Sequence, residues 1–201
     1  MQTLATHSTN DTKARILDAA EQIMLEKGFN GVGLNEILKS VGVPKGSFYH
    51  WFSSKEQFGV ELIRHYAADS LAYKRQWFAK IETLPNARER IITFLEAGLT
   101  HFIEKDCGPV CLIVKLMTEV TPLSQDMRDE QVKYFREVLE IFKTVIKEGQ
   151  AQGSIKPDLD PMIAAGIIND LWLGSYMRAS VCRSGQPGRS TISFIMSYLA
   201  P

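Results

Sequence analysis

The chain has 201 residues, of which 45% are hydrophobic, and its 23 Lys and Arg side chains balance 23 Asp and Glu side chains. This composition indicates one or two globular domains with a sizeable core, and the zero net charge argues against indiscriminate binding to nucleic acid, so any DNA affinity must come from a local patch. No apolar run has the length of a membrane span and the polar N-terminus is unlike a signal peptide, so we expect a cytoplasmic protein with no membrane partner. Because the chain has an odd number of cysteines, three, and no export signal, we expect them to be free thiols.

The N-terminal residues predict an arm followed by a helix. Residues 1–10 are polar and rich in Thr and Ser, and we expect them to be disordered. A helix should begin near Asn10 or Asp11 and stop at Gly28. Apolar side chains recur along it at helical spacing, at Ile16, Leu17, Ala20, Ile23 and Met24.

The segment from Gly28 to Phe52 predicts a helix-turn-helix. A short helix opens at Leu34, with an apolar face made by Leu34, Ile37, Leu38 and Val41. Gly42 breaks this helix, because glycine can take the positive φ that a tight turn requires, and Pro44 suits the first turn of a second helix that ends near Phe52. Three aromatic side chains of the second helix should pack inward, namely Phe48, Trp51 and Phe52.

The opposite face of this second helix carries residue types that contact DNA. In a helix-turn-helix the second helix lies in the major groove, and its N-terminus offers free N–H groups and a positive dipole to a phosphate. From Ile37 to Lys55 the chain has three lysines, one histidine and no carboxylate. The alternative is an ordinary helical hairpin with an exposed polar face. The candidate DNA-binding residues are Asn35, Pro44, Lys45, Gly46, Ser47, Tyr49, His50 and Lys55.

Everything after the helix-turn-helix also predicts helices. Ser53 and Glu56 have the spacing of a capping box, which should start a long helix that runs to about residue 81. Further helices, separated by Gly, Pro and Asp clusters, are expected at 87–105, 111–120, 124–152, 160–180 and 190–199. No strand alternation is present. The fold class is therefore all-α.

Cys111 is a candidate sensor. Gly108 and Pro109 place it in the first turn of a helix, where free N–H groups and the helix dipole favour a thiolate, and Lys115 one turn later adds a positive charge. A thiolate attacks electrophiles and is the form that is oxidised. The alternative is a buried cysteine that serves as a small inert apolar residue.

Other candidate sites have weaker support. An apolar effector pocket could be lined by Phe102, Lys115, Met117, Trp172 and Tyr176, although each side chain is also a natural core residue. His101, Cys107 and Cys111 lack the further ligands of a metal site, Glu119 and Asp170 have no assignable partner, and neither a phosphate loop nor a nucleophile elbow is present. We therefore expect no metal, no cofactor and no enzyme, although a thiol-dependent redox enzyme with a vestigial helix-turn-helix is the alternative from another class.

Several motifs resemble the TetR family of bacterial transcriptional repressors. They are Leu34-Asn-Glu-Ile37, Val41-Gly-Val-Pro-Lys-Gly-Ser-Phe-Tyr-His-Trp-Phe52 and Ser54-Lys-Glu56, with Gly33 where the family usually has Thr or Ser. The resemblance implies a homodimer on near-palindromic double-stranded operator DNA. It divides the chain into an arm (1–10), a helix-turn-helix domain (11–60) and an effector-sensing and dimerisation domain (61–201). The dimer interface, or alternatively part of the protomer core, would contain Ile163, Ile167, Leu171, Ile192, Ile195 and Met196.

A second set of motifs is similar to the NemR subgroup of that family, which responds to N-ethylmaleimide. They are Val110-Cys-Leu-Ile-Val-Lys-Leu116, Glu119-Val120, Leu123-Ser-Gln-Asp-Met-Arg128 and Leu171-Trp-Leu-Gly174. The similarity implies that an electrophile or oxidant modifies Cys111 and releases the repressor. Where the subgroup has a lysine that partners this cysteine, the chain has Ser180, which leaves Cys107 or Cys182 as resolving thiols. The alternative is induction by an apolar small molecule bound without a covalent bond.

Overall fold

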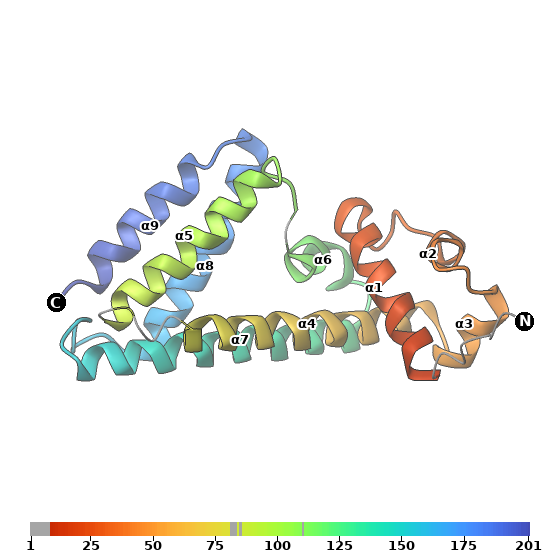
Figure 1. The fold of residues 1–201 in the computed structure, drawn as a ribbon, viewed down its shortest axis with the longest axis horizontal. Helices are drawn as coiled ribbons and strands as arrows, with labels where there is room; N and C mark the ends of the chain where they lie inside the picture. The colour runs from red at the N-terminus through yellow and green to blue at the C-terminus, as the bar shows by residue number, and fades with distance from the viewer. Residues whose placement is uncertain (1–8, 81–83, 85, 110) are drawn as a thin grey trace, which may run out of the picture. The chain divides into compact units, whose positions relative to one another are not determined.

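The computed structural model describes residues 9–80, 84, 86–109 and 111–201, and its regular elements are all α-helices (Figure 1). The predicted all-α fold is confirmed. The predicted arm lies outside the described residues except for Thr9 and Asn10, which begin the first helix. The helices are α1 (Thr9–Lys27), α2 (Leu34–Ser40), α3 (Lys45–Trp51), α4 (Lys55–Lys80), α5 (Ala87–Glu104), α6 (Leu112–Val120), α7 (Gln125–Ala151), α8 (Pro161–Cys182) and α9 (Gln186–Leu199).

The described residues form two compact units that are not contiguous in sequence. The first unit contains the described residues of 1–68 together with 111–131, and the second contains those of 69–110 together with 132–201. Helices α4 and α7 each pass from one unit into the other. The functional division expected near residue 60 stays a prediction, because the units group α6 and the start of α7 with the helix-turn-helix. Within the described ranges, no helix combines the length and apolar character needed to cross a membrane.

A glycine-based cap ends α2 and makes the turn of the helix-turn-helix. Gly42 has φ +67°, its N–H donates to the carbonyl of Lys39 (3.3 Å), and the N–H of Val43 donates to the carbonyl of Leu38 (2.9 Å). This is the Schellman arrangement, in which a residue with positive φ satisfies the last carbonyls of a helix. The predicted turn at Gly42 is thereby confirmed. Pro44 is the N-cap of α3 and so lies one residue before the first turn in which it was expected.

Three phenylalanine rings form the core beneath α3. Phe48 and Phe52, together with Phe58 from α4, are at most 1% exposed, and the three pairs of ring centroids are 4.9 to 5.5 Å apart. Phe48 and Phe52 thus point inward as predicted, whereas Trp51 is half-buried. The cap of α4 differs from the prediction: the N–H of Gln57 donates to the hydroxyl of Ser54 (3.0 Å), so Ser54 rather than Ser53 caps this helix.

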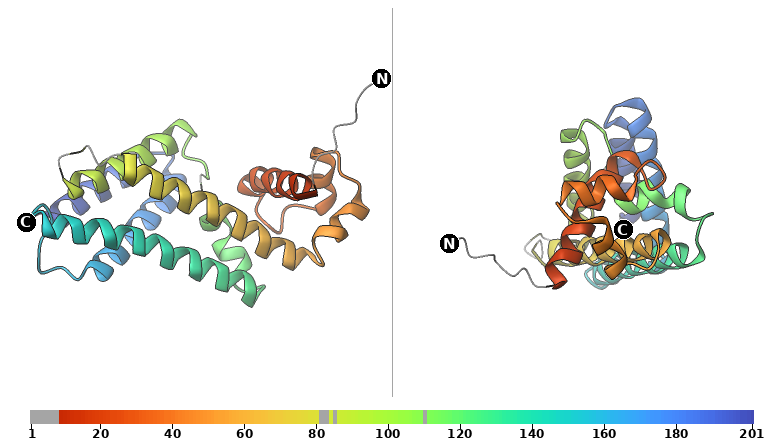
Figure 2. Two further views of the ribbon diagram at one scale, coloured as in Figure 1. Left: turned by 60° about the horizontal axis from the view of Figure 1, so that its bottom comes forward. Right: turned by 90° about the vertical axis from the view of Figure 1, so that its right-hand side faces the viewer.

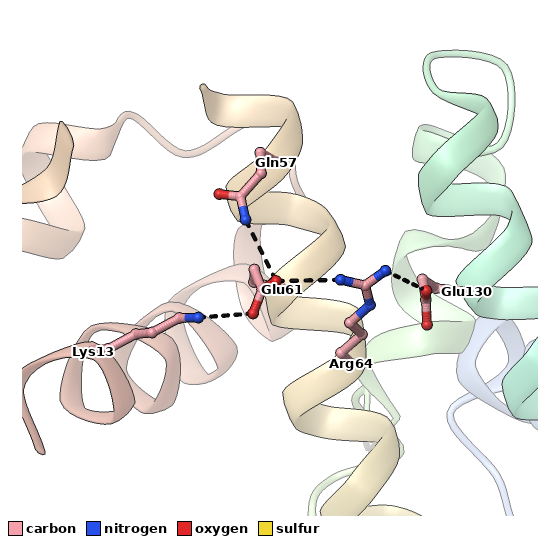
Figure 3. A network of polar contacts seen from close by, with 5 residues as sticks. All are labelled: Lys13, Gln57, Glu61, Arg64 and Glu130. Atoms are coloured by element: carbon pink, nitrogen blue, oxygen red, sulfur yellow. Dashed lines mark hydrogen bonds and ion pairs between the residues drawn. The ribbon is translucent and has the colours of Figure 1, made fainter. Parts of the chain in front are cut away.

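A chain of charged side chains links α1, α4 and α7 within the first unit (Figure 3). Lys13 Nζ donates to Glu61 Oε2 (2.8 Å). Arg64 donates from Nη1 to Glu61 Oε1 (3.2 Å) and from Nη2 to Glu130 Oε1 (2.7 Å). The hydrogen bond from Lys13 lowers the pKa of Glu61 below its usual value of 4.5, although burial acts in the opposite direction. These pairs hold α1 against α4, and therefore stabilise the support of the helix-turn-helix.

In the second unit, α9 packs against both α5 and α8 (Figures 1 and 2). Asp160 caps α8 by accepting hydrogen bonds from the N–H groups of Met162 (2.8 Å) and Ile163 (2.9 Å). Helix α9 begins at Gln186, four residues earlier than predicted, because Pro187 occupies its first turn, where a missing N–H costs little.

We predict that Gly33→Ser stabilises the protein. Gly33 is the exposed N-cap of α2 with φ −84° and ψ 143°, it has no side chain to cap the helix, and nothing lies within 4 Å of an added Cβ. A serine adds the cap and restricts the unfolded chain, so the free energy of unfolding should rise by about 0.5–1 kcal/mol. Urea unfolding measures this change. Gly42→Ala is the contrasting control and should destabilise, because its φ is positive; a Gly33→Ser protein no more stable than wild type would contradict the prediction.

We predict that Glu61→Gln destabilises the protein in a pH-dependent way. Because the pKa of Glu61 is lowered in the folded state, the stability it contributes is present above pH 4.5 and is lost as the pH falls through its folded pKa. At pH 7 the variant should lose roughly 0.5–1 kcal/mol, since the pair is partly exposed to solvent. Chemical unfolding should show that this difference shrinks near pH 3.5. Glu26→Gln, an exposed carboxylate of α1, is the control, and an equal loss for Glu61→Gln at both pH values would rule out the linkage.

Candidate functional site

The outer face of α3 presents the predicted DNA contacts to solvent. Lys45, Gly46 and His50 are exposed, and Tyr49 is 58% exposed. The buried ring of Phe48 lies against Tyr49 with centroids 5.4 Å apart, and thereby orients this face. No side chain caps the start of α3. The remaining candidates at the same end are Asn35 and Pro44, which are exposed, and Ser47, which is half-buried.

Lys55 has a structural role in addition to its predicted one. Its Nζ donates to the carbonyl of Val32 (3.1 Å) and lies 4.9 Å from the centroid of the Phe29 ring. Both partners belong to the segment that joins α1 to α2, residues 28–33, which we call the α1–α2 loop. Lys55 therefore fixes this loop to the start of α4, and its contact with a phosphate stays a prediction.

Glu119, for which the sequence suggests no partner, contacts the same loop from α6. Its Oε2 accepts a hydrogen bond from the backbone N–H of Asn30 (3.1 Å), and its Oε1 lies 2.1 Å from the position that a Cβ on Gly28 would take. Gly28 also has φ +76°, so its backbone favours glycine, and a side chain at this position would displace the Glu119 carboxylate. The two sides of this contact are 89 residues apart in the chain, which is why local sequence patterns give no signal of it.

Cys111 is the N-cap of α6, one residue earlier than the first-turn position expected from the sequence. It has φ −135° and ψ 115°, is half-buried, and its side chain makes no capping hydrogen bond. Its carbonyl accepts the N–H of Lys115 (3.0 Å), which is half-buried one turn along α6. The thiol thus lies at the start of the helix that carries Glu119 at its other end.

The other two cysteines belong to the second unit. Cys107 is buried just after α5 and, like Asp106 before it, has φ +54°. Cys182 is exposed at the last position of α8, and Ser180 is half-buried on the same helix. Arg183 donates to the carbonyl of Asp106 (2.7 Å) and so connects the ends of α5 and α8. A resolving role for Cys107 or Cys182 stays a prediction.

Among the predicted pocket residues, Tyr176 contacts both Phe102 and Trp172. The rings of Phe102 and Tyr176 lie 4.6 Å apart, those of Trp172 and Tyr176 lie 4.9 Å apart, and the Tyr176 hydroxyl donates to the carbonyl of Gly98 (2.8 Å). This cluster joins α5 to α8 in the second unit. Lys115 and Met117 are half-buried on α6 in the first unit.

Among the described residues, no group of three or more His, Cys, Asp and Glu side chains could hold a metal ion. The second carboxylate without a predicted partner, Asp170, is exposed and accepts a hydrogen bond from the side chain of its neighbour Asn169 (3.3 Å).

Comparison with known proteins decides the family. Residues 16–62 match the family described as bacterial regulatory proteins of the tetR family, and residues 87–195 match a tetracyclin repressor-like C-terminal domain. The protein belongs to the TetR family. The resemblance inferred from the sequence is thereby confirmed.

Several TetR-family relatives are similar over nearly the whole chain. The transcriptional repressor NemR of Escherichia coli K12 is 35% identical over 196 residues, which cover 96% of each chain. The repressor DhaR of Mycobacterium sp. GP1 is 30% identical over 94% of this chain and 92% of its own. The crystal structure of reduced E. coli NemR superposes with a TM-score of 0.88 at 34% identity, over 94% of this chain and 97% of that one. A TetR regulatory protein from Rhodobacter sphaeroides gives 0.83 at 27% identity, over 92% and 97%.

The predicted interface residues on α8 and α9, the last two helices of this TetR-family protein, fall into a buried group and a more exposed group. Ile192 and Ile195 are buried within the protomer, which favours the core alternative for them, and their contact with a partner stays a prediction. Ile163, Leu171 and Met196 are exposed, and Ile167 is half-buried. Two further exposed apolar side chains of α8 and α9, which the sequence does not single out, are Val181 and Phe194. Met177, a natural lining residue for an apolar pocket, is also exposed on α8.

We predict that Lys45→Ala weakens DNA binding without destabilising this TetR-family protein. The side chain is exposed on α3, so its loss should remove a phosphate contact, lower affinity about fivefold and reduce the slope of log K against log salt by about one. Fluorescence anisotropy with the DNA upstream of the gene, over a range of salt, measures both. Lys133→Ala, an exposed lysine of α7, is the control, and an unchanged salt slope for Lys45→Ala would exclude Lys45 as a phosphate contact.

Proposed function

We propose that the protein is a TetR-type transcriptional repressor that inserts α3 into the major groove of operator DNA. The observation that carries this proposal is the face of α3, where Lys45, Tyr49 and His50 are exposed while Phe48 is fixed in the core. Lysine and histidine suit phosphates and base edges, and the uncapped start of a helix suits a phosphate. Gly46 supports it as well, because nothing lies within 4 Å of the position that a Cβ on it would take, which leaves its backbone open to approach by DNA.

The protein acts as a homodimer in this proposal. Exposed apolar side chains gather on α8 and α9, among them Ile163 at 64%, Val181 at 85% and Phe194 at 54% exposed. Soluble monomers rarely expose so many large apolar side chains together, and such a surface typically meets another protein. A two-fold dimer presents two copies of α3, which matches a near-palindromic operator with half-sites about 34–36 Å apart.

The proposed signal is covalent modification of Cys111. A thiolate adds to an activated carbon–carbon double bond, forming a carbon–sulfur bond while the neighbouring carbon takes up a proton, so no further reactant is required. The position of Cys111 at the start of α6 and its partial exposure support this role. The similarity to NemR over 96% of the chain adds support, as does the existence of a defined reduced form of that relative.

Release from DNA requires only a modest change in free energy. A modified state that disfavours the DNA-binding arrangement by about 1–3 kcal/mol lowers operator affinity roughly five- to 150-fold. Helix α4 is one candidate connection, because it runs without interruption from Lys55 to Lys80 and contributes residues to both units.

An inducer that binds without covalent bonds is the second candidate. The aromatic cluster of Phe102, Trp172 and Tyr176 favours it, since flat apolar ligands bind beside such rings. In that mechanism Cys111 contributes only to packing. The two mechanisms differ in whether a thiol is required.

We predict that Cys111→Ser keeps operator binding and loses the response to electrophiles. N-ethylmaleimide should weaken wild-type binding at least fivefold and leave the variant unchanged, because serine does not form the thioether. Anisotropy titrations with and without the reagent measure this difference, and mass spectrometry identifies the modified cysteine. Cys182→Ser, which removes the exposed thiol, is the matched control. If wild type and Cys111→Ser respond equally, the thiol mechanism fails and the non-covalent inducer remains.

A further inference from the structure

The α1–α2 loop connects α1 to the helix-turn-helix. It ends at Gly33, the N-cap of α2, and α2 leads through the capped turn at Gly42 into α3. Lys27 in the last turn of α1 forms an ion pair with Glu36 in the first turn of α2, across this loop. The loop is thus connected to α2 both through the chain and through this ion pair.

Two helices from elsewhere in the first unit bind this loop. Lys55 at the start of α4 holds the carbonyl of Val32, and Glu119 in the last turn of α6 holds the N–H of Asn30. The Glu119 carboxylate also fills the space that a side chain on Gly28 would occupy. Of these two contacts, the one made by Glu119 comes from α6, the helix whose N-cap is Cys111.

The helix dipole opposes a carboxylate at this place. The C-terminal end of a helix carries partial negative charge, which disfavours acidic side chains in the last turn, and α6 has no basic residue there to compensate. The hydrogen bond from Asn30 offsets this cost only while the loop and α6 keep their relative position. Hydrogen bonds weaken steeply when the donor–acceptor distance or angle departs from its preferred value. The contact is thus sensitive to small movements of α6.

Helix α6 connects Cys111 to Glu119. Cys111 is the N-cap of the helix and Glu119 lies in its last turn, eight residues later, which corresponds to about 12 Å at 1.5 Å per residue. Helix α6 packs against α1, so a displacement of the N-terminal end of α6 would change its position relative to α1 and to the loop that follows α1.

We infer that Glu119 is a positioning residue for DNA binding, whose carboxylate holds the α1–α2 loop and thereby places α3. Modification of Cys111 displaces α6, withdraws this carboxylate from Asn30 and releases the loop. The regulatory half of this inference rests on the proposed function of Cys111, whereas the positioning half stands without it.

The test compares three substitutions at Glu119 in the full-length protein. Glu119→Gln keeps an oxygen that accepts the Asn30 N–H, Glu119→Asp keeps the charge but is one methylene too short, and Glu119→Ala removes both. Operator affinity is measured by anisotropy on the upstream DNA before and after treatment with N-ethylmaleimide, and thermal unfolding is recorded for each protein. Thr118→Ala, at the exposed neighbouring position of α6, is the control.

We expect Glu119→Gln and Thr118→Ala to behave as wild type. Glu119→Ala and Glu119→Asp should bind the operator at least about fivefold more weakly before treatment, and N-ethylmaleimide should change their affinity by less than about twofold, because the contact it breaks is already absent. Wild-type affinity of Glu119→Asp and Glu119→Ala would overturn the inference, as would a loss in Glu119→Gln equal to that in Glu119→Ala. If Glu119→Ala does not fold, the Asp and Gln variants decide the question.

Failure of the proposed sensor gives a different result. In that case N-ethylmaleimide leaves the wild type on its operator, whereas the affinities of the three untreated Glu119 variants still follow the order expected from the hydrogen bond. A wild type that responds to the reagent, together with a Glu119→Ala protein that responds equally, would instead leave Cys111 as the sensor and remove Glu119 from the connection.

Discussion

Packing of Phe48 and Phe52 against Phe58 is the constraint on which the proposed DNA-binding surface depends. Helix α3 has seven residues, and isolated helices shorter than about 12–15 residues are marginal in water, so tertiary burial must hold it. The three rings are buried and lie within 5.5 Å of one another. Because α3 has one buried face, Lys45 and Tyr49 are forced toward solvent, which makes core packing and the candidate DNA interface two sides of one short helix.

Charge is segregated in a protein whose net charge is zero. Carboxylates at Glu61 and Glu130 pair with cations inside the first unit and hold α1, α4 and α7 together. Helix α3, by contrast, contains a lysine and a histidine and no carboxylate. Because these two carboxylates are paired with cations of α1 and α4, α3 can present a positive surface although the whole protein is not basic. This arrangement suits selective rather than general binding to DNA.

Local patterns predicted the helices and the turn, whereas contacts between distant segments could not be read from them. The glycine at position 42, the inward phenylalanines and most helix ends follow from short-range rules of capping and periodicity. The capping residue of α4 was predicted one position too early, because Ser53 and its neighbour Ser54 are both suitable N-cap residues. The partner of Glu119 could not be predicted, because it is a backbone N–H, which has no sequence signature. Burial of Ile192 and Ile195 depends on how α9 packs against its neighbours.

The composition of the first unit has a consequence for how such proteins diversify. Its folding core draws on α6 and the start of α7, which are encoded more than forty residues after the rest of the unit, at 111–131 against 1–68. A single genetic crossover between the two stretches would join α1 and its loop to an α6 that did not evolve with them. Regulators of this architecture should therefore exchange these two stretches less freely than a two-part description implies, because α6 has to fit the α1–α2 loop that it contacts.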